Sequence, residues 1–252
     1  MPMIPKSQWV LLALFVATTV AGCGGAPNPV EPLVVLGEQA ESETSEDAEG
    51  RRTGDWIIVP GERVGRITAA TTATDLISVY GATNVRNEEV YLGEGFSEMG
   101  TGLYLSDESK TLRILWQDPE EKARPASIQI TGATSVWKTE AGITLGTPLT
   151  KVQELNGKPF KLFGFEWDYG GTLSDGNNGN IKGLAHEDPE KGFLPAYLSL
   201  TFQPDYEGKP DFPQEKMRQV SGDTEFSSDH PVMQELDPLV YSITVSFPDP
   251  EE

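Results

Sequence analysis

Apolar and polar residues alternate along short stretches separated by Gly, Pro and Asp, which is typical of strands joined by turns. The clearest stretch is 240–247, where Tyr241, Ile243, Val245 and Phe247 fall on one side of an extended chain. Seven further stretches fit strands: 89–92, 102–105, 112–116, 127–130, 160–167, 180–184 and 197–202. The pattern predicts a strand-rich α+β protein with antiparallel sheets.

Two short helices are expected at a constant spacing along the chain. Ile67 aligns with Ile143, Thr71 with Thr147, Leu76 with Val152 and Gly81 with Gly157, an offset of 76 residues without a gap. Each copy offers a Thr able to cap a helix, apolar residues spaced for one helix face, and a Gly placed to end the helix. In the second copy Pro148 falls at the expected first helical position. We therefore predict two tandem repeats of a short helix packed on an antiparallel β-sheet, over 55–141 and 142–252.

The first 22 residues have the features of an export signal. Lys6 precedes an apolar run at 9–20, which is too short to span a bilayer. The run ends at Val20-Ala21-Gly22-Cys23, which resembles the bacterial lipobox. The resemblance implies a signal peptide over 1–22, acylation of Cys23, and a lipid-anchored protein of the bacterial cell envelope. Because Gly24 rather than Asp follows, the outer membrane facing the periplasm is favoured in a Gram-negative cell; an ordinary signal peptide is the alternative.

Residues 23–54 differ in composition from the rest of the chain. Seven acidic residues accompany Pro, Ser and Gly, with only Arg51 and Arg52 to balance them. Such a segment cannot bury enough apolar surface to offset its ordering entropy, so we predict an acidic flexible tether. The apolar stretch 32–36 is a candidate docking strand within it.

The whole chain is acidic, with 39 Asp or Glu against 19 Lys or Arg and a formal charge of −20. This charge repels phosphate backbones, so nucleic-acid binding is excluded. It serves solubility or forms a face for a basic partner. The single Cys excludes intrachain disulfides and cysteine-based zinc clusters, and we expect no cofactor and no metal.

The densest local feature is the Gly- and aromatic-rich segment 164–180. In an extended chain Glu166 and Asp168 share one face and Phe165, Trp167 and Tyr169 the other. Exposed aromatic rings beside a Gly-Asn loop are what a sugar or peptide site needs. The candidate ligand-binding residues are Glu166, Trp167, Asp168, Tyr169 and Asp175. The alternative is a hairpin whose aromatic residues complete the core.

Few other groups could carry chemistry. His186 and His230 stand beside carboxylates and could meet around a zinc ion, but single surface histidines are commoner. Asp229 is expected to cap a short helix at 232–236. Glu166 and Asp168 could form a glycosidase-type pair, although the chain has many acids. No nucleophile elbow, phosphate loop or dinucleotide fingerprint occurs in the sequence.

The pattern ITLGTPLTKVQELNG at 143–157, taken with its earlier copy, resembles two known architectures. One is the tandem helix-and-sheet repeat of the β-lactamase inhibitor proteins; the other is the single unit of the small lipoprotein of the outer-membrane β-barrel assembly machine. Residues 56–247 also resemble an uncharacterised bacterial lipoprotein family, which implies no activity.

We therefore expect a membrane-anchored envelope lipoprotein with a non-catalytic binding or assembly role. Its expected partners are the lipid bilayer, through acylated Cys23, and a protein or glycan of the envelope. Two alternatives are an envelope hydrolase with a carboxylate or His-based site, and a proteinaceous inhibitor of an envelope or secreted enzyme.

Overall fold

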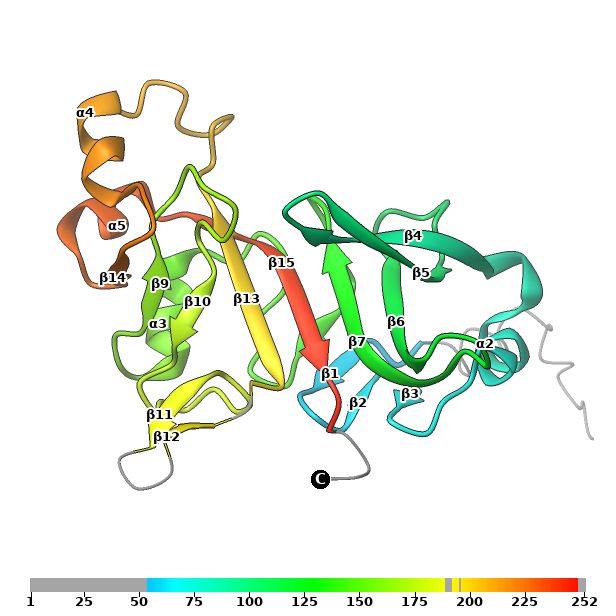
Figure 1. Ribbon diagram of the computed structural model, residues 1–252. Helices are drawn as coiled ribbons and strands as arrows, with labels where there is room; N and C mark the ends of the chain where they lie inside the picture. The colour runs from blue at the N-terminus through cyan, green and yellow to red at the C-terminus, as the bar shows by residue number, and fades with distance from the viewer. Residues whose placement is uncertain (1–53, 189–191, 195, 249–252) are drawn as a thin grey trace, which may run out of the picture. The chain divides into compact units, whose positions relative to one another are not determined.

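Strands dominate the structure, a computed structural model that describes residues 54–188, 192–194 and 196–248 (Figure 1). Strand accounts for 39% and helix for 17%, and the sheets are largely antiparallel, which confirms the strand-rich α+β prediction. The predicted signal peptide, Cys23 and the tether up to residue 53 lie outside the described residues. No helix within the described ranges is long and apolar enough to cross a membrane.

The largest sheet has six antiparallel strands in the order β13-β15-β7-β6-β5-β4 (Figure 1). Their bounds are β4 (Val85–Gly93), β5 (Phe96–Leu103), β6 (Leu112–Asp118), β7 (Ala123–Thr131), β13 (Leu198–Gln203) and β15 (Leu239–Ser246). Strands β4 to β7 pair with their neighbours in chain order. Strand β15 lies between β13 and β7, so this sheet contains strands from both predicted repeats.

One face of this sheet is buried and apolar. Ile130 of β7, Ile243 of β15 and Leu200 of β13 lie in register, and all three are fully buried. Burying such a side chain contributes roughly 1.5–3 kcal/mol. The opposite face carries polar side chains, such as Gln129 and Ser199 in register with Thr244. The alternation explains why these strands were recognisable from sequence.

Both predicted helices are present. Helix α2 (Ala73–Tyr80) and helix α3 (Leu149–Asn156) are offset by the expected 76 residues, and Gly81 and Gly157 follow them with positive φ. Gly157 has left-handed αL geometry, and its amide donates to the carbonyls of residues 153 and 154. The predicted offset of the two helices and the glycines that end them are therefore confirmed.

The expected capping roles of Thr71 and Thr147 were wrong by one position. Their hydroxyl oxygens accept hydrogen bonds from the amides of Thr68 and Thr144, each at 3.0 Å, and so fix the turn before each helix. Helix α2 is capped by Thr72, which forms a capping box with Asp75. Pro148 is the N-cap residue of α3 rather than its first helical residue.

Each helix start is attached to the start of a long strand in the same way. The amide of Ala73 donates to the carbonyl of Lys122 just before β7 (2.9 Å), and that of Leu149 donates to the carbonyl of Pro238 just before β15 (2.8 Å). The amides of Arg124 and Val240 return the contact to Thr71 and Thr147. These local contacts match between the copies; a tandem repeat of complete helix-and-sheet units stays a prediction.

Smaller elements complete the fold. A four-stranded sheet has the order β3-β2-β1-β8, a three-stranded sheet has the order β10-β9-β14, and β11 pairs with β12. Their bounds are β1 (Ile57–Val59), β2 (Arg63–Val64), β3 (Ile67–Thr68), β8 (Lys138–Thr139), β9 (Lys161–Phe163), β10 (Leu173–Asp175), β11 (His186–Asp188), β12 (Gly192–Leu194) and β14 (Glu225–Ser227). The short helices are η1 (Ala82–Asn84), α4 (Gln214–Met217), η2 (Arg218–Val220) and α5 (Pro231–Leu236). The stretch 180–184, expected as a strand, forms none.

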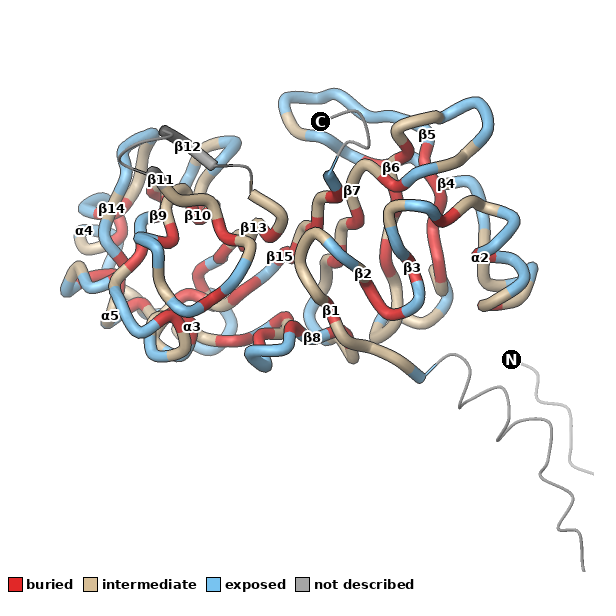
Figure 2. The backbone as a smooth tube through the Cα atoms, turned by 90° about the horizontal axis from the view of Figure 1, so that it is seen from below, coloured by how far each residue is buried: buried red, intermediate tan, exposed pale blue. Residues whose placement is uncertain are grey.

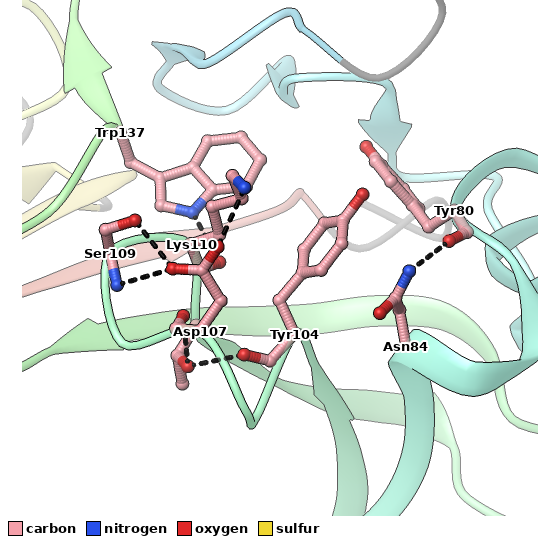
Figure 3. A network of polar contacts seen from close by, with 8 residues as sticks. Tyr80, Asn84, Tyr104, Asp107, Ser109, Lys110 and Trp137 are labelled. Carbon is pink, nitrogen blue, oxygen red and sulfur yellow. Dashed lines mark hydrogen bonds and ion pairs between the residues drawn. The ribbon is translucent and has the colours of Figure 1, made fainter. Parts of the chain in front are cut away.

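Trp137 anchors the core of the first half. Its ring is fully buried and lies edge-on to Trp56, with centroids 4.7 Å apart. The indole nitrogen donates to the carbonyl of Lys110 (2.9 Å), as Figure 3 shows. The Asp107 carboxylate accepts hydrogen bonds from Lys110 and Ser109, which hold the pKa of Asp107 below its usual value. The Trp137 indole therefore bonds to a turn that the side chains of Asp107, Ser109 and Lys110 stabilise.

Candidate functional site

The segment after β9 turns instead of continuing as a strand. Glu166 has a left-handed backbone with φ +68°, and the amide of Gly170 donates to the carbonyl of Trp167 at 2.9 Å. The amide of Gly171 then returns to the carbonyl of Phe163 (3.0 Å). The predicted arrangement, with Glu166 and Asp168 on one strand face and the aromatic residues on the other, is therefore wrong.

The three aromatic side chains of this loop have different surroundings. Phe165 is buried, whereas Trp167 is half-buried between the rings of Phe163 and Tyr169, with centroids 5.5 and 5.4 Å away. The Trp167 indole nitrogen donates to the carbonyl of Gly164 (2.8 Å). Tyr169 is 47% exposed. The core interpretation thus holds for Phe165, and Tyr169 is open to a partner.

The loop is fixed to β13 by Gly171. Its carbonyl accepts from the amide of Phe202 (2.8 Å), its φ is +77°, and an added Cβ would lie 2.0 Å from the Phe202 carbonyl oxygen. Gly171→Ala should therefore lower the free energy of unfolding by about 2–3 kcal/mol, because strain and a backbone clash combine. Urea denaturation measures this change. Gly95→Ala is the control for positive φ without crowding, and an equal loss in both variants would contradict the clash.

Tyr169 joins this loop to the tip of the β4–β5 hairpin. Its hydroxyl donates to Oε1 of Glu94 at 3.1 Å, and Glu94 lies at the tip between Gly93 and Gly95. The hydrogen bond to Glu94 and the carboxylate charge raise the pKa of Tyr169, because both disfavour the phenolate. Segments 75 residues apart in the chain therefore meet at one surface.

The outer part of the hairpin carries four large apolar side chains on its two faces, which we together name the hairpin surface. Tyr91, Leu92, Phe96 and Met99 are between 45 and 68% exposed. In Figure 2 the hairpin is largely coloured as exposed, and the inner half of β5 is buried. The carboxylates of Glu89, Glu94 and Glu98 alternate with these apolar residues along the chain. The surface is thus apolar with acidic neighbours.

A cavity of about 460 Å³ lies at the end of β13 and the start of β15, and we name it the tyrosine pocket. Asp205, Tyr206, Glu207 and Tyr241 are among the residues that line it. A β-bulge places Tyr241 there: Thr201 pairs with Ser242 and Phe202 with Val240, so Tyr241 has no partner position and is exposed. The alternation predicted for 240–247 is broken at this bulge.

Glu166 lies close enough to the tyrosine pocket to act on Tyr206. Partial burial raises the pKa of Tyr206, and the negative charge of Glu166 raises it further. Glu166 and Asp168 are both exposed. The loop at 163–172 therefore adjoins the hairpin surface through Tyr169 and the tyrosine pocket through Glu166.

Asp175 has a separate structural role. Its Oδ1 accepts from the amide of Asn177 (2.7 Å), and Oδ2 lies 3.9 Å from Nζ of Lys161. The following Gly-Asn loop is fixed by buried Asn156, whose side-chain amide donates to the carbonyl of Gly176 (2.9 Å). These contacts hold the Gly-Asn loop in its turn, so the role of Asp175 is structural.

In the described part of the chain, His186 and His230 have separate contacts. His230, rather than the predicted Asp229, caps α5, since its Nδ1 accepts from the amide of Val232 (3.2 Å). His186 is the first residue of β11, and its Nδ1 lies 3.4 Å from the carbonyl of Leu184. Among the described residues, no three His, Cys, Asp or Glu side chains gather where they could hold a metal ion.

No family model, curated protein or solved structure matches this chain. The resemblances drawn from sequence therefore stay predictions, and function has to be argued from surface chemistry. Sequence reasoning missed the hairpin surface and the tyrosine pocket. One signal was available: Tyr91 and Leu92 are adjacent in an expected strand, so both cannot face the same core.

Proposed function

We propose that the protein is a lipid-anchored, non-catalytic lipoprotein of the bacterial envelope that binds a protein partner through the hairpin surface. The observation that carries the proposal is the exposure of Tyr91, Leu92, Phe96 and Met99 on one hairpin. Aromatic residues and Met are enriched in protein interfaces, and large exposed apolar side chains gathered on one hairpin mark an interaction site.

The charges beside the hairpin surface favour a protein over the bilayer as its occupant. Glu94 lies at the tip, and Glu89 and Glu98 lie on the two strands next to it. Carboxylates are repelled by anionic lipid headgroups, so a membrane-inserted hairpin would be opposed electrostatically. Membrane attachment is assigned instead to acylated Cys23. A flexible tether over 23–54, as predicted from the sequence, would have a reach of about 30 Å and would let the folded part meet partners away from the lipid.

The inhibitor and hydrolase alternatives require different features of the molecule. A proteinaceous inhibitor would bind its target enzyme through such a surface, so it differs from our proposal only in the identity of the partner. A hydrolase would need reacting groups in a shielded site. Glu166 and Asp168 are exposed, and His230 is engaged as a helix cap. The arrangement favours binding over catalysis.

A photoreactive phenylalanine analogue in place of Phe96 should give a discrete protein adduct on irradiation of whole cells. Ile77 is the matched control position, because it is also an exposed apolar residue (46%) but lies on α2. We expect no discrete adduct from position 77. Adducts to lipid alone from position 96, or identical adducts from both positions, would contradict a protein-binding hairpin.

Met99→Ser should reduce the yield of that adduct while leaving thermal stability nearly unchanged. Met99 is 60% exposed, and exposed substitutions usually change stability by less than about 0.5 kcal/mol. An interface anchor, in contrast, is worth about 2 kcal/mol or more, which is roughly a 30-fold loss in affinity. Adduct yield and the thermal midpoint are measured on the same variant, and an unchanged yield would remove Met99 from the interface.

A further inference from the structure

We propose that the tyrosine pocket is a binding site for an organic cation, namely the guanidinium or ammonium group of a basic side chain. The site is distinct from the hairpin surface and is lined by other residues. Two tyrosines and two acidic residues line one cavity, and each kind of side chain attracts a cation by a separate mechanism.

The aromatic contribution comes from Tyr206 and Tyr241. Both line the cavity and are exposed, at 58 and 44%, so ring surface is available to a ligand. A cation above a tyrosine ring is attracted by the ring quadrupole, by roughly 0.5–1 kcal/mol at exposed sites. The bulge in β15 presents Tyr241, and Tyr206 comes from the loop after β13. The rings therefore reach the cavity from two separate elements.

The electrostatic contribution comes from Asp205 and Glu207. Oδ1 of Asp205 accepts from the amide of Gly208 (2.7 Å), which fixes this carboxylate in a turn at the cavity. Glu166 adds a third negative charge close to Tyr206. The lining residues, all in the described part of the chain, include no Lys, Arg or His. The cavity is thus negatively charged without a basic group in its own wall.

The closest basic residue in the sequence is committed elsewhere. Nζ of Lys209 donates to the carbonyls of Glu235 and Leu236, each at 2.8 Å, at the end of α5. These bonds place the ammonium group where the helix dipole favours a cation. Lys209 therefore serves α5, and the charge of Asp205 and Glu207 is left for a ligand.

The backbone keeps the cavity open. Gly132 and Gly146 line it with φ of +127° and +80°, and nothing lies within 4 Å of the position that a Cβ would take at either residue. Side chains are disfavoured at such φ values, so the space is set by the main chain. The volume of about 460 Å³ falls in the range of small-ligand sites, roughly 300–1,000 Å³. One long basic side chain fits this scale.

The test uses the purified full chain in detergent, labelled with 3-fluorotyrosine and observed by ¹⁹F NMR. The probe is the capped peptide Ac-Gly-Arg-Gly-NH₂, and the matched neutral probe replaces Arg by citrulline. We expect saturable shifts of the Tyr206 and Tyr241 signals, assigned by Tyr206→Phe and Tyr241→Phe. The arginine peptide should bind at least about tenfold more tightly than the citrulline peptide, since the charge-assisted and cation–π contacts are lost together.

Three variants make the result specific. Glu207→Gln should weaken the arginine peptide about threefold or more, whereas Glu120→Gln, an exposed acid in the β6–β7 turn, should have no effect. Ala133→Trp should fill the cavity and abolish the shifts. Equal affinity for both peptides, or binding that survives Ala133→Trp, would overturn the proposal. Saturable shifts with chitotriose instead of the arginine peptide would identify a glycan site and reject a cation site.

Discussion

Trp137→Ala is expected to lower the free energy of unfolding by about 3–5 kcal/mol, the largest effect of any single substitution considered. The fully buried ring would leave a cavity beside Trp56, and the carbonyl of Lys110 would lose its donor. The cavity and the unpaired carbonyl would lie side by side, so both costs fall on the same part of the core. Denaturant unfolding followed by circular dichroism measures the change.

Two controls separate these contributions. Trp137→Phe keeps most of the apolar volume but removes the indole donor, so it should cost less than the Ala variant. Tyr91→Ala removes an exposed ring and should change stability by less than about 0.5 kcal/mol. If Trp137→Ala were as mild as Tyr91→Ala, the central place of Trp137 in the core would be wrong.

Cys23→Ser is expected to abolish lipid attachment completely. The thiol is the acyl acceptor that the lipobox resemblance implies, and Cys23 is the only Cys in the chain. Radiolabelled palmitate should therefore be absent from the variant, and the signal peptide should stay uncleaved by the lipoprotein peptidase. Cell fractionation and mass measurement of the N-terminus follow both events.

Ala26→Ser is the matched control, since it introduces the same residue three positions later and keeps the acyl acceptor. Its palmitate labelling should equal that of the unaltered protein. Unchanged labelling of Cys23→Ser would reject lipidation at this residue and with it the anchored localisation.

Regular elements followed from the sequence because their side-chain periodicity is tied to burial. Leu76 and Val152 mark the buried faces of α2 and α3, and the Gly after each helix marks its end. The strands β4 to β7, β13 and β15 each overlap an expected stretch, since one sheet face is apolar. Pairing was not predictable in the same way, because β15 joins β7 and β13 through contacts between distant segments.

The candidate site was predictable only in part. Tyr169 is exposed as a ligand surface requires, but the strand that was expected to present it does not exist beyond Phe163. Glu166 adopts a left-handed conformation that its residue type does not favour, so the turn at this position could not be predicted from residue preferences. Tyr241 reaches the cavity through a β-bulge and Tyr206 through a loop. Neither leaves a periodic pattern in the sequence.

The central place of β15 makes the main sheet depend on a strand that is synthesised after all its other strands. This strand is the last of the described elements, yet β7 and β13 each pair with it. Until residues 239–246 leave the ribosome, both neighbours keep an open edge of unpaired amides and carbonyls, which is a template for aggregation. A chain terminated before residue 239 would therefore lack the strand that joins β7 to β13, and it would become a target for quality-control proteases. Only a chain that includes residues 239–246 can pair both of these edges.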